Sequence, residues 1–172
     1  MKFYQSIGYI VIITANVLFT EAMAQLKPGD KAPGFSGKDQ NGNVITLAEF
    51  RGKKVVLYFY PKDDTPGCTA EACNLRDNYS TLTQKQYVVI GVSPDNELSH
   101  QKFSGKYNLP FILIADTSHQ ILKLYNAWGE KVSYGKTSEG VLRKTYVIDG
   151  DGIIIKVIDK VETANHTQQI LD

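Results

Sequence analysis

The sequence contains only two cysteines in 172 residues, and they lie five positions apart, at Cys68 and Cys73. A chain of this length can bury a sufficient apolar core without disulfides or metal ions, so the cysteines are not needed to hold the fold together. Their spacing is neither that of a CxxC motif nor that of a zinc site, and the three histidines are scattered. These absences exclude a CxxC-type dithiol oxidoreductase and argue against a metal centre.

An excess of charge of one sign is also absent. The chain carries 19 Lys and Arg against 18 Asp and Glu, a formal net charge of +1, with no long run of either sign. This balance gives no indication of nucleic acid as a partner. The 42% of hydrophobic and 22% of charged residues are typical of a globular protein, and we find no repeat and no low-complexity linker. A single domain is expected.

The first residues differ in kind from the rest. Lys2 is followed by a mostly apolar stretch over residues 7–19 and then by Ala22, Met23 and Ala24. A basic start, an apolar middle and an AxA site are the three parts of a secretory signal peptide. We therefore expect residues 1–24 to be a signal peptide and the mature protein to be exported, to the periplasm, without a membrane attachment after cleavage. A retained membrane anchor and a cytoplasmic protein are the alternatives.

Apolar runs in the remainder predict a central sheet. Residues 55–60 and 87–93 are almost unbroken apolar runs, as in strands that are buried on both faces. The other predicted elements are an N-terminal hairpin turning at residues 39–43, a helix through and beyond the cysteines, helices over 97–107 and 118–125, a strand over 111–114, a hairpin formed by 143–148 and 153–158, and a last helix from about Asn165. Strands that alternate with helices imply parallel pairing, and the hairpins add antiparallel strands. Residues 25–172 are thus expected to form one α/β domain of thioredoxin-like architecture, with a mixed central sheet flanked by helices.

The cysteine segment follows directly on the strand at 55–60. A strand, a Pro/Gly loop and then a helix place Cys68 in the first helical turn, where free backbone N–H groups and the helix dipole favour a thiolate. On a regular helix, five residues separate two Cα atoms by roughly 8 to 9 Å, whereas disulfides usually require about 4.4 to 6.8 Å. Cys68 and Cys73 therefore cannot bond while the helix is intact. A simple structural disulfide remains the alternative to a redox cycle with a conformational step.

The residues around Cys68 favour the redox cycle. Thr65 lies three residues before Cys68, within reach of a thiolate or a bound oxygen, while Pro61 and Pro66 stiffen the loop and Gly67 completes it. The pattern PxxxTxxC formed by Pro61, Thr65 and Cys68 resembles the active-site signature of the peroxiredoxins. With Cys73 five residues later, it is similar to the bacterioferritin comigratory protein or peroxiredoxin Q branch of that family. The resemblance runs from about Leu26 to Leu171.

This resemblance implies both a fold and a reaction. Peroxiredoxins have a thioredoxin-like fold and reduce hydrogen peroxide or organic hydroperoxides without metal, haem, flavin or any other cofactor. It implies that Cys68 is the peroxidatic cysteine, that Cys73 is the resolving cysteine, and that the two form a disulfide which a thioredoxin-like donor reduces. The family also places an arginine beside the peroxidatic sulfur, on a strand of the form RxxFxID. Residues 143–149 match this strand with Tyr146 in place of Phe, which implies that Arg143 is a site residue.

Two other interpretations use the same cysteine pair. An exported thiol–disulfide exchange protein would share the fold, and a redox sensor would signal through the same disulfide. Rapid oxidation by peroxide distinguishes the peroxidase from both. The expected partners are thus a peroxide and a thioredoxin-like reductant, and we expect a monomer or a weak dimer.

Overall fold

The computed structural model describes residues 25–133 and 135–172 of the chain. The predicted signal peptide, residues 1–24, lies outside the described residues. Among the described residues, no helix is both long and apolar enough to cross a membrane.

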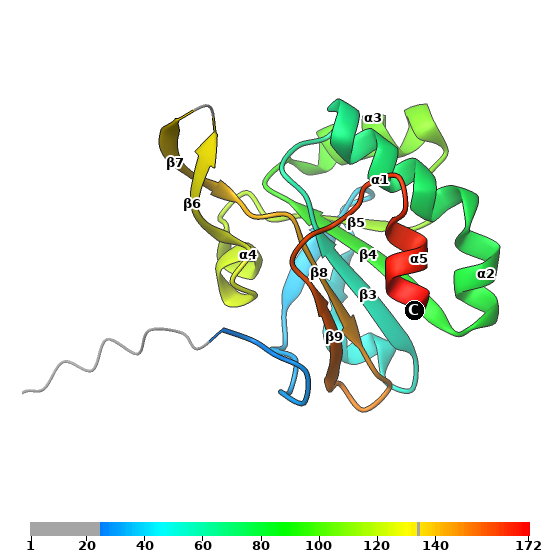
Figure 1. The fold of residues 1–172 in the computed structure, drawn as a ribbon. Coiled ribbons are helices and arrows are strands. Elements are labelled where there is room, and N and C mark those ends of the chain that lie inside the picture. Colours follow the sequence, from blue (N-terminus) through cyan, green and yellow to red (C-terminus); the bar gives the residue numbers. More distant parts are fainter. Residues whose placement is uncertain (1–24, 134) are drawn as a thin grey trace, which may run out of the picture.

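A seven-stranded sheet forms the centre of the molecule (Figure 1). Its strands are β1 (Ser36–Asp39), β2 (Val44–Thr46), β3 (Lys54–Phe59), β4 (Tyr87–Ser93), β5 (Ile112–Ala115), β8 (Lys144–Ile148) and β9 (Ile154–Ile158). They lie in the order β2-β1-β5-β4-β3-β8-β9. The pairs β3–β4 and β4–β5 are parallel, whereas β1–β2, β1–β5, β3–β8 and β8–β9 are antiparallel. The predicted mixed sheet is confirmed.

Helices cover both faces of this sheet. They are the 3-10 helix η1 (Leu47–Phe50) and the α-helices α1 (Pro66–Asp77), α2 (Tyr79–Gln84), α3 (Glu97–Tyr107), α4 (Gln120–Leu124) and α5 (His166–Leu171). Alternate residues of a strand point to opposite faces, so Val55 and Leu57 of β3 join the core under α4, while Val56 and Tyr58 join the core under α1, α2, α3 and α5. The β3 strand, which leads to the cysteine segment, is therefore anchored on both sides.

Most predicted elements are found at or near their predicted positions. Helix α3 spans residues 97–107 as predicted, and the Asn96 side chain caps its start by accepting a hydrogen bond from the Ser99 N–H at 2.9 Å. Both predicted hairpins pair antiparallel, and the last helix begins at His166. Helix α4 is shorter than the predicted helix over residues 118–125: it has five residues, starts at Gln120 and ends at Leu124.

The prediction missed one hairpin and one helix break. Strands β6 (Trp128–Ser133) and β7 (Lys136–Val141) form a separate two-stranded sheet that extends away from the main body (Figure 1). Residues 136–139 are exposed, so β7 has no apolar alternation that would reveal a strand. The helix predicted to continue beyond the cysteines ends at Asp77, and α2 starts anew after Asn78, whose side-chain amide donates to the Asn74 carbonyl at 2.8 Å.

Candidate active site

Cys68 lies in the first turn of α1, as predicted. Thr65 is the N-cap residue with extended backbone angles, and Pro66 occupies the first helical position, where a missing N–H costs nothing. Cys68 is the third residue of the helix and is 2% exposed. Its backbone N–H belongs to the group at a helix start that lacks an intrahelical partner. The positive end of the helix dipole therefore points at a sulfur that is largely shielded from water, where its attraction for developing negative charge is screened little.

Arg143 brings a fixed positive charge to this sulfur. Its Nη2 donates to Cys68 Sγ at 3.2 Å, across 75 residues of sequence. The same guanidinium uses Nη1 to pair with Glu71 Oε2. Arg143 lies in the segment between β7 and β8, one residue before the strand on which it was expected. The guanidinium fork thus joins the cysteine to a carboxylate one helical turn further along α1.

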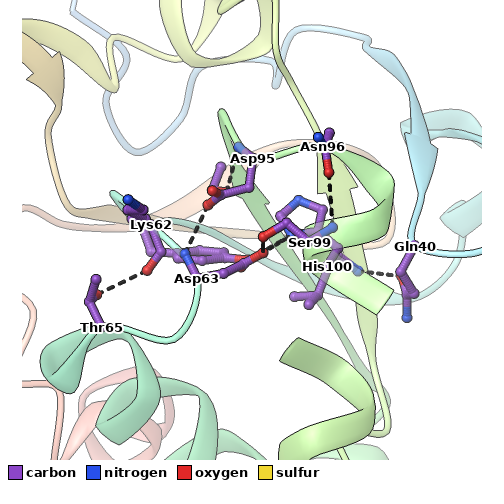
Figure 2. A network of polar contacts seen from close by, with 11 residues as sticks. Gln40, Lys62, Asp63, Thr65, Asp95, Asn96, Ser99 and His100 are labelled. Atoms are coloured by element: carbon purple, nitrogen blue, oxygen red, sulfur yellow. Dashed lines mark hydrogen bonds and ion pairs between the residues drawn. The ribbon is translucent and has the colours of Figure 1, made fainter. Parts of the chain in front are cut away.

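The loop that precedes α1 is held by a buried polar network, which Figure 2 shows. The Asp63 carboxylate accepts hydrogen bonds from Tyr60 Oη and Ser99 Oγ, both at 2.7 Å, and lies 2.8 Å from His100 Nδ1. The Asp63 N–H donates to Asp95 Oδ2 at 2.8 Å. Side chains from α3 and from the turn that follows β4 therefore fix Asp63, two residues before the helix cap.

Asp64 holds the same loop from the solvent side. Its backbone has a positive φ of 55°, a conformation that aspartate tolerates better than most residues. The carboxylate accepts hydrogen bonds from Lys106 Nζ at 2.7 and 2.9 Å and from Tyr107 Oη at 2.6 Å. Adjacent aspartates thus tie the loop to two parts of α3. The position of Cys68 is set by more than the two prolines that the sequence singled out.

The Thr65 hydroxyl donates its hydrogen bond within the loop. Its Oγ1 donates to the Lys62 carbonyl at 2.9 Å instead of to the Cys68 sulfur (Figure 2). A hydroxyl that donates its proton in one hydrogen bond can still accept another through its oxygen lone pairs. Pro61 and Pro66 flank this turn as predicted. At Gly67, an added Cβ would lie 3.5 Å from Arg143 Nη2, so the guanidinium lies directly beside the Gly67 backbone.

Cys73 lies on the same continuous helix as Cys68, and both are free thiols. It is partly buried, and its neighbour Asn74 ties α1 to α5. The Asn74 side chain accepts from the Thr167 N–H and the Thr167 hydroxyl, both at 2.8 Å, and donates to the Ala164 carbonyl at 2.9 Å. Helix α1 is intact from one cysteine to the other, and the two sulfurs are not bonded.

Glu71 and His166 are site residues that the sequence analysis missed. Both side chains are 0% exposed, and Glu71 Oε1 lies 3.3 Å from His166 Nδ1. Burial raises the pKa of Glu71 to about 7 and lowers the pKa of His166 to about 4. Glu71 lies three residues after Cys68, a spacing that puts two side chains on one face of a helix. That spacing was the signal that could have revealed Glu71, whereas no signal in the sequence indicated His166.

The Glu71→Gln variant is expected to become more stable relative to the wild type as the pH rises from about 4.5 to about 7. In this window the folded protein keeps the Glu71 proton that the unfolded chain releases, so rising pH destabilises the wild type. Glutamine does not titrate. The difference in the free energy of unfolding should grow by about 3 kcal/mol, since each pKa unit corresponds to about 1.36 kcal/mol. Urea unfolding at a series of pH values measures it.

The exposed Glu139 provides the matched control. Its replacement by glutamine should shift stability by a small amount that does not change over the same pH range. The buried His166 contributes the opposite slope between pH 4 and 6.5, because only its unfolded form takes up a proton there. His166 contacts Glu71, so its contribution cancels between the two proteins only where it does not titrate, which is above pH 6.5. A difference between the Glu71→Gln variant and the wild type that is independent of pH would contradict this assignment.

A thioredoxin-like fold that presents a buried cysteine at a helix N-terminus, paired with an arginine, defines a class of thiol-dependent redox enzymes. Residues 28–157 match the AhpC/TSA family. The chain is 43% identical to Peroxiredoxin Bcp of Bacillus subtilis (strain 168), over 83% of this chain and 91% of the relative. It is also 43% identical to Peroxiredoxin Bcp of Escherichia coli (strain K12), over 87% and 96%.

Solved structures give the same result. A cysteine-to-serine mutant of Xylella fastidiosa PrxQ superposes with a TM-score of 0.81 at 27% identity, over 86% of this chain and 94% of that one. A bacterioferritin comigratory protein of Xanthomonas campestris gives 0.75 at 31% identity, over 80% and 87%. The chain belongs to the AhpC/TSA family of peroxiredoxins, and it is a thiol peroxidase. The fold and the family expected from the sequence are confirmed.

The predicted export to the periplasm is wrong. The relatives found by comparison are Bcp peroxiredoxins, which are cytoplasmic proteins. The prediction depended on the basic start, the apolar stretch and the AxA site of residues 1–24, which lie outside the described residues. The peroxidase assignment does not depend on it, because the family match covers residues 28–157.

Proposed function

We propose that this peroxidase reduces hydrogen peroxide and organic hydroperoxides with Cys68 as the peroxidatic cysteine. The observation that carries the proposal is the 3.2 Å contact between Arg143 Nη2 and Cys68 Sγ at a helix N-terminus. The Cys68 thiolate attacks one peroxide oxygen and the O–O bond breaks. The attacked oxygen stays on the sulfur as a sulfenic acid, and the other leaves with a proton as water or alcohol.

Three groups are suited to stabilise this transition state. The Arg143 guanidinium and the Cys68 N–H face the place where negative charge develops on the peroxide oxygens. The Thr65 hydroxyl donates to the Lys62 carbonyl, so its oxygen is free to accept the peroxide O–H. The loop and the start of α1 supply the Thr65 acceptor and the Cys68 N–H donor, and the segment before β8 supplies Arg143; together they orient the peroxide O–O bond toward the sulfur.

Cys73 is proposed as the resolving cysteine. Its thiolate attacks the sulfenic sulfur, water leaves, and a Cys68–Cys73 disulfide forms. Both cysteines lie on the continuous helix α1, so this step requires local unwinding of the helix. The Asn74 contacts with Thr167 and Ala164 have to open if the unwinding extends beyond Cys73. A thioredoxin-like dithiol then reduces the disulfide by exchange.

The Cys73→Ser variant is expected to keep the first oxidation and to lose efficient recycling. Cys73 does not contact the Arg143 guanidinium, so the rate constant for oxidation of Cys68 should stay within about threefold of wild type. Turnover with a thioredoxin donor should fall at least about tenfold, and the sulfenic acid should persist and react with a second peroxide. Coupled assays and mass spectrometry follow both steps. Wild-type turnover in this variant would contradict the resolving role.

Stopped-flow oxidation of the reduced protein tests the proposed function. Excess hydrogen peroxide should produce a fast change in intrinsic fluorescence, with a rate proportional to peroxide concentration. A thiol–disulfide exchange protein or a redox sensor without peroxidase activity would instead react with peroxide as slowly as an ordinary thiol. The absence of a fast phase at excess peroxide would reject the proposal.

A further inference from the structure

A second buried contact lies behind the arginine. Glu71 of α1 uses Oε2 to pair with Arg143, and its other oxygen, Oε1, lies 3.3 Å from His166 Nδ1 of α5. Neither Glu71 Oε1 nor His166 Nδ1 has a hydrogen-bond partner in the described part of the chain, and each has the other as its polar neighbour at 3.3 Å. An unsatisfied polar atom in a protein interior costs about 1 to 3 kcal/mol. These two atoms are therefore left to satisfy each other, which requires one proton between them.

The far side of the imidazole is occupied as well. His166 Nε2 lies 2.9 Å from Thr145 Oγ1 on β8, and Thr145 is fully buried. A continuous series of contacts therefore runs from Thr145 through His166, Glu71 and Arg143 to the Cys68 sulfur. It connects the C-terminal helix with the start of α1.

Two proton arrangements satisfy this series. Since the pKa of His166 is lowered to about 4, the imidazole is neutral near pH 7 and carries one N–H. In the first arrangement Nδ1–H donates to ionised Glu71 while Nε2 accepts from the Thr145 hydroxyl. In the second, protonated Glu71 donates to Nδ1 and Nε2–H donates to Thr145. The pKa of Glu71, raised to about 7 by burial, allows both near neutral pH.

The two arrangements differ in how they hold Arg143. Ionised Glu71 forms a charge-assisted pair with the guanidinium, whereas protonated Glu71 offers a neutral acceptor that is roughly half as strong. Only the first arrangement fixes the guanidinium firmly, because it anchors Nη1 on a carboxylate while Nη2 faces the sulfur. The proton on His166 Nδ1 thus decides how rigidly the positive charge is presented to Cys68.

We propose that His166 is a positioning residue for the peroxidatic cysteine: its Nδ1–H holds Glu71 ionised, and Glu71 in turn aims the Arg143 guanidinium at the Cys68 sulfur. The inference rests on the proposed roles of Cys68 and Arg143. His166 acts on the sulfur indirectly, through the side chains of Glu71 and Arg143.

The other groups around Glu71 and His166 cannot replace the His166 Nδ1–H as a donor to Glu71. Tyr58 of β3 packs its ring edge-on against His166 at 6.1 Å between centroids, and burial raises the pKa of Tyr58 so that it stays neutral. Arg143 faces it from the segment before β8 and is a permanent cation. Cys68 of α1, the reacting group, contacts Arg143. Glu71 is the group on this pair that titrates near neutral pH.

Two amide replacements of His166 separate its two nitrogens. His166→Asn puts an amide N–H near the place of Nδ1 and keeps the donor to Glu71. His166→Gln puts its amide near the place of Nε2, so it keeps the contact with Thr145 and loses the donor to Glu71. Both remove the imidazole. Thr167→Val is the matched control, because it weakens the docking of α5 on Asn74 without touching Glu71 or Arg143.

The measured quantity is the rate constant of Cys68 oxidation by hydrogen peroxide, in stopped flow from about pH 5 to about pH 9, together with Tm. We expect His166→Asn to stay within about threefold of wild type. His166→Gln should be at least about tenfold slower at pH 7.5, since it loses one hydrogen bond to a charged group. In the wild type the rate constant should rise near pH 7 as Glu71 ionises. The midpoint of this rise should move to higher pH in His166→Gln only. Thr167→Val should lower Tm and leave the rate unchanged.

Equal rates for the two amide variants, or rates that simply follow Tm in all three, would overturn the inference and leave His166 as a docking residue. The ¹⁵N shifts of the His166 imidazole in the wild-type protein give a second test that needs no variant. They should report an Nδ1–H tautomer above pH 7, and an Nε2–H tautomer there would also overturn it. If the wild type itself lacks the fast Cys68 phase, the proposed function fails instead.

Discussion

The Cys68→Ser variant is expected to lose the fast reaction with peroxide altogether. Serine fits the same space at the start of α1, so the fold and the Arg143 environment should persist. Its hydroxyl has no accessible anion near neutral pH and no base beside it, and it cannot become a sulfenic acid. Turnover should fall to the background rate, a loss of about 10⁴-fold or more, as when a nucleophile is removed from a preorganised site. Stopped-flow fluorescence and a coupled thioredoxin assay measure it.

The Cys73→Ser protein is the matched control for this experiment. It carries the same substitution five residues away on the same helix, and it should retain the first oxidation. Rapid oxidation of the Cys68→Ser protein at its remaining thiol, Cys73, would show that the peroxidatic role had been given to the wrong cysteine.

The Arg143→Gln variant is expected to have the second-largest effect. Glutamine can hydrogen-bond but carries no charge, so the sulfur loses the fixed cation at 3.2 Å and the buried Glu71 loses its counter-ion. Removing one donor that stabilises a developing charge typically reduces a rate about 10²- to 10³-fold. The rate constant for Cys68 oxidation should fall by this amount. Stopped-flow measurement at several pH values separates slower attack from a smaller fraction of thiolate.

Arg143→Lys tests whether the fork or only the charge matters. A lysine keeps the positive charge but cannot reach Glu71 and the sulfur with two nitrogens of one planar group. We expect it to recover only part of the lost rate. Full recovery would mean that the guanidinium geometry is unimportant, and a wild-type rate in Arg143→Gln would exclude Arg143 from the site.

The sheet could be predicted because its signals are local. The apolar runs over residues 55–60 and 87–93 and the hairpin pattern of 143–148 and 153–158 each carry their own information, and β3, β4 and the β8–β9 hairpin are found where they were expected. The β6–β7 hairpin was missed because its second strand is mostly exposed and shows no alternation. Strands that lack a buried face leave little trace in a single sequence.

The site could be predicted only in part, for a physical reason. Cys68 and its helix start follow from consecutive residues, but its partners come from distant segments. Arg143, 75 residues away, was assigned by family resemblance, and its contact with the sulfur then appeared in the structure. Glu71 and His166 were missed because a buried ion pair depends on how α1, the segment before β8 and α5 pack together. The Lys62 carbonyl was not predicted as the acceptor of the Thr65 hydroxyl, because it becomes available only through the turn of the loop.

Rapid-quench mass spectrometry of the reduced protein tests the central claim most directly. The protein is mixed with a small excess of hydrogen peroxide, stopped at increasing times with a reagent that traps sulfenic acids, and digested. The account predicts that one oxygen appears first on Cys68 and is then replaced by a Cys68–Cys73 disulfide. A first oxidation on Cys73, or oxidation of both thiols at the slow rate of an ordinary cysteine, would contradict it.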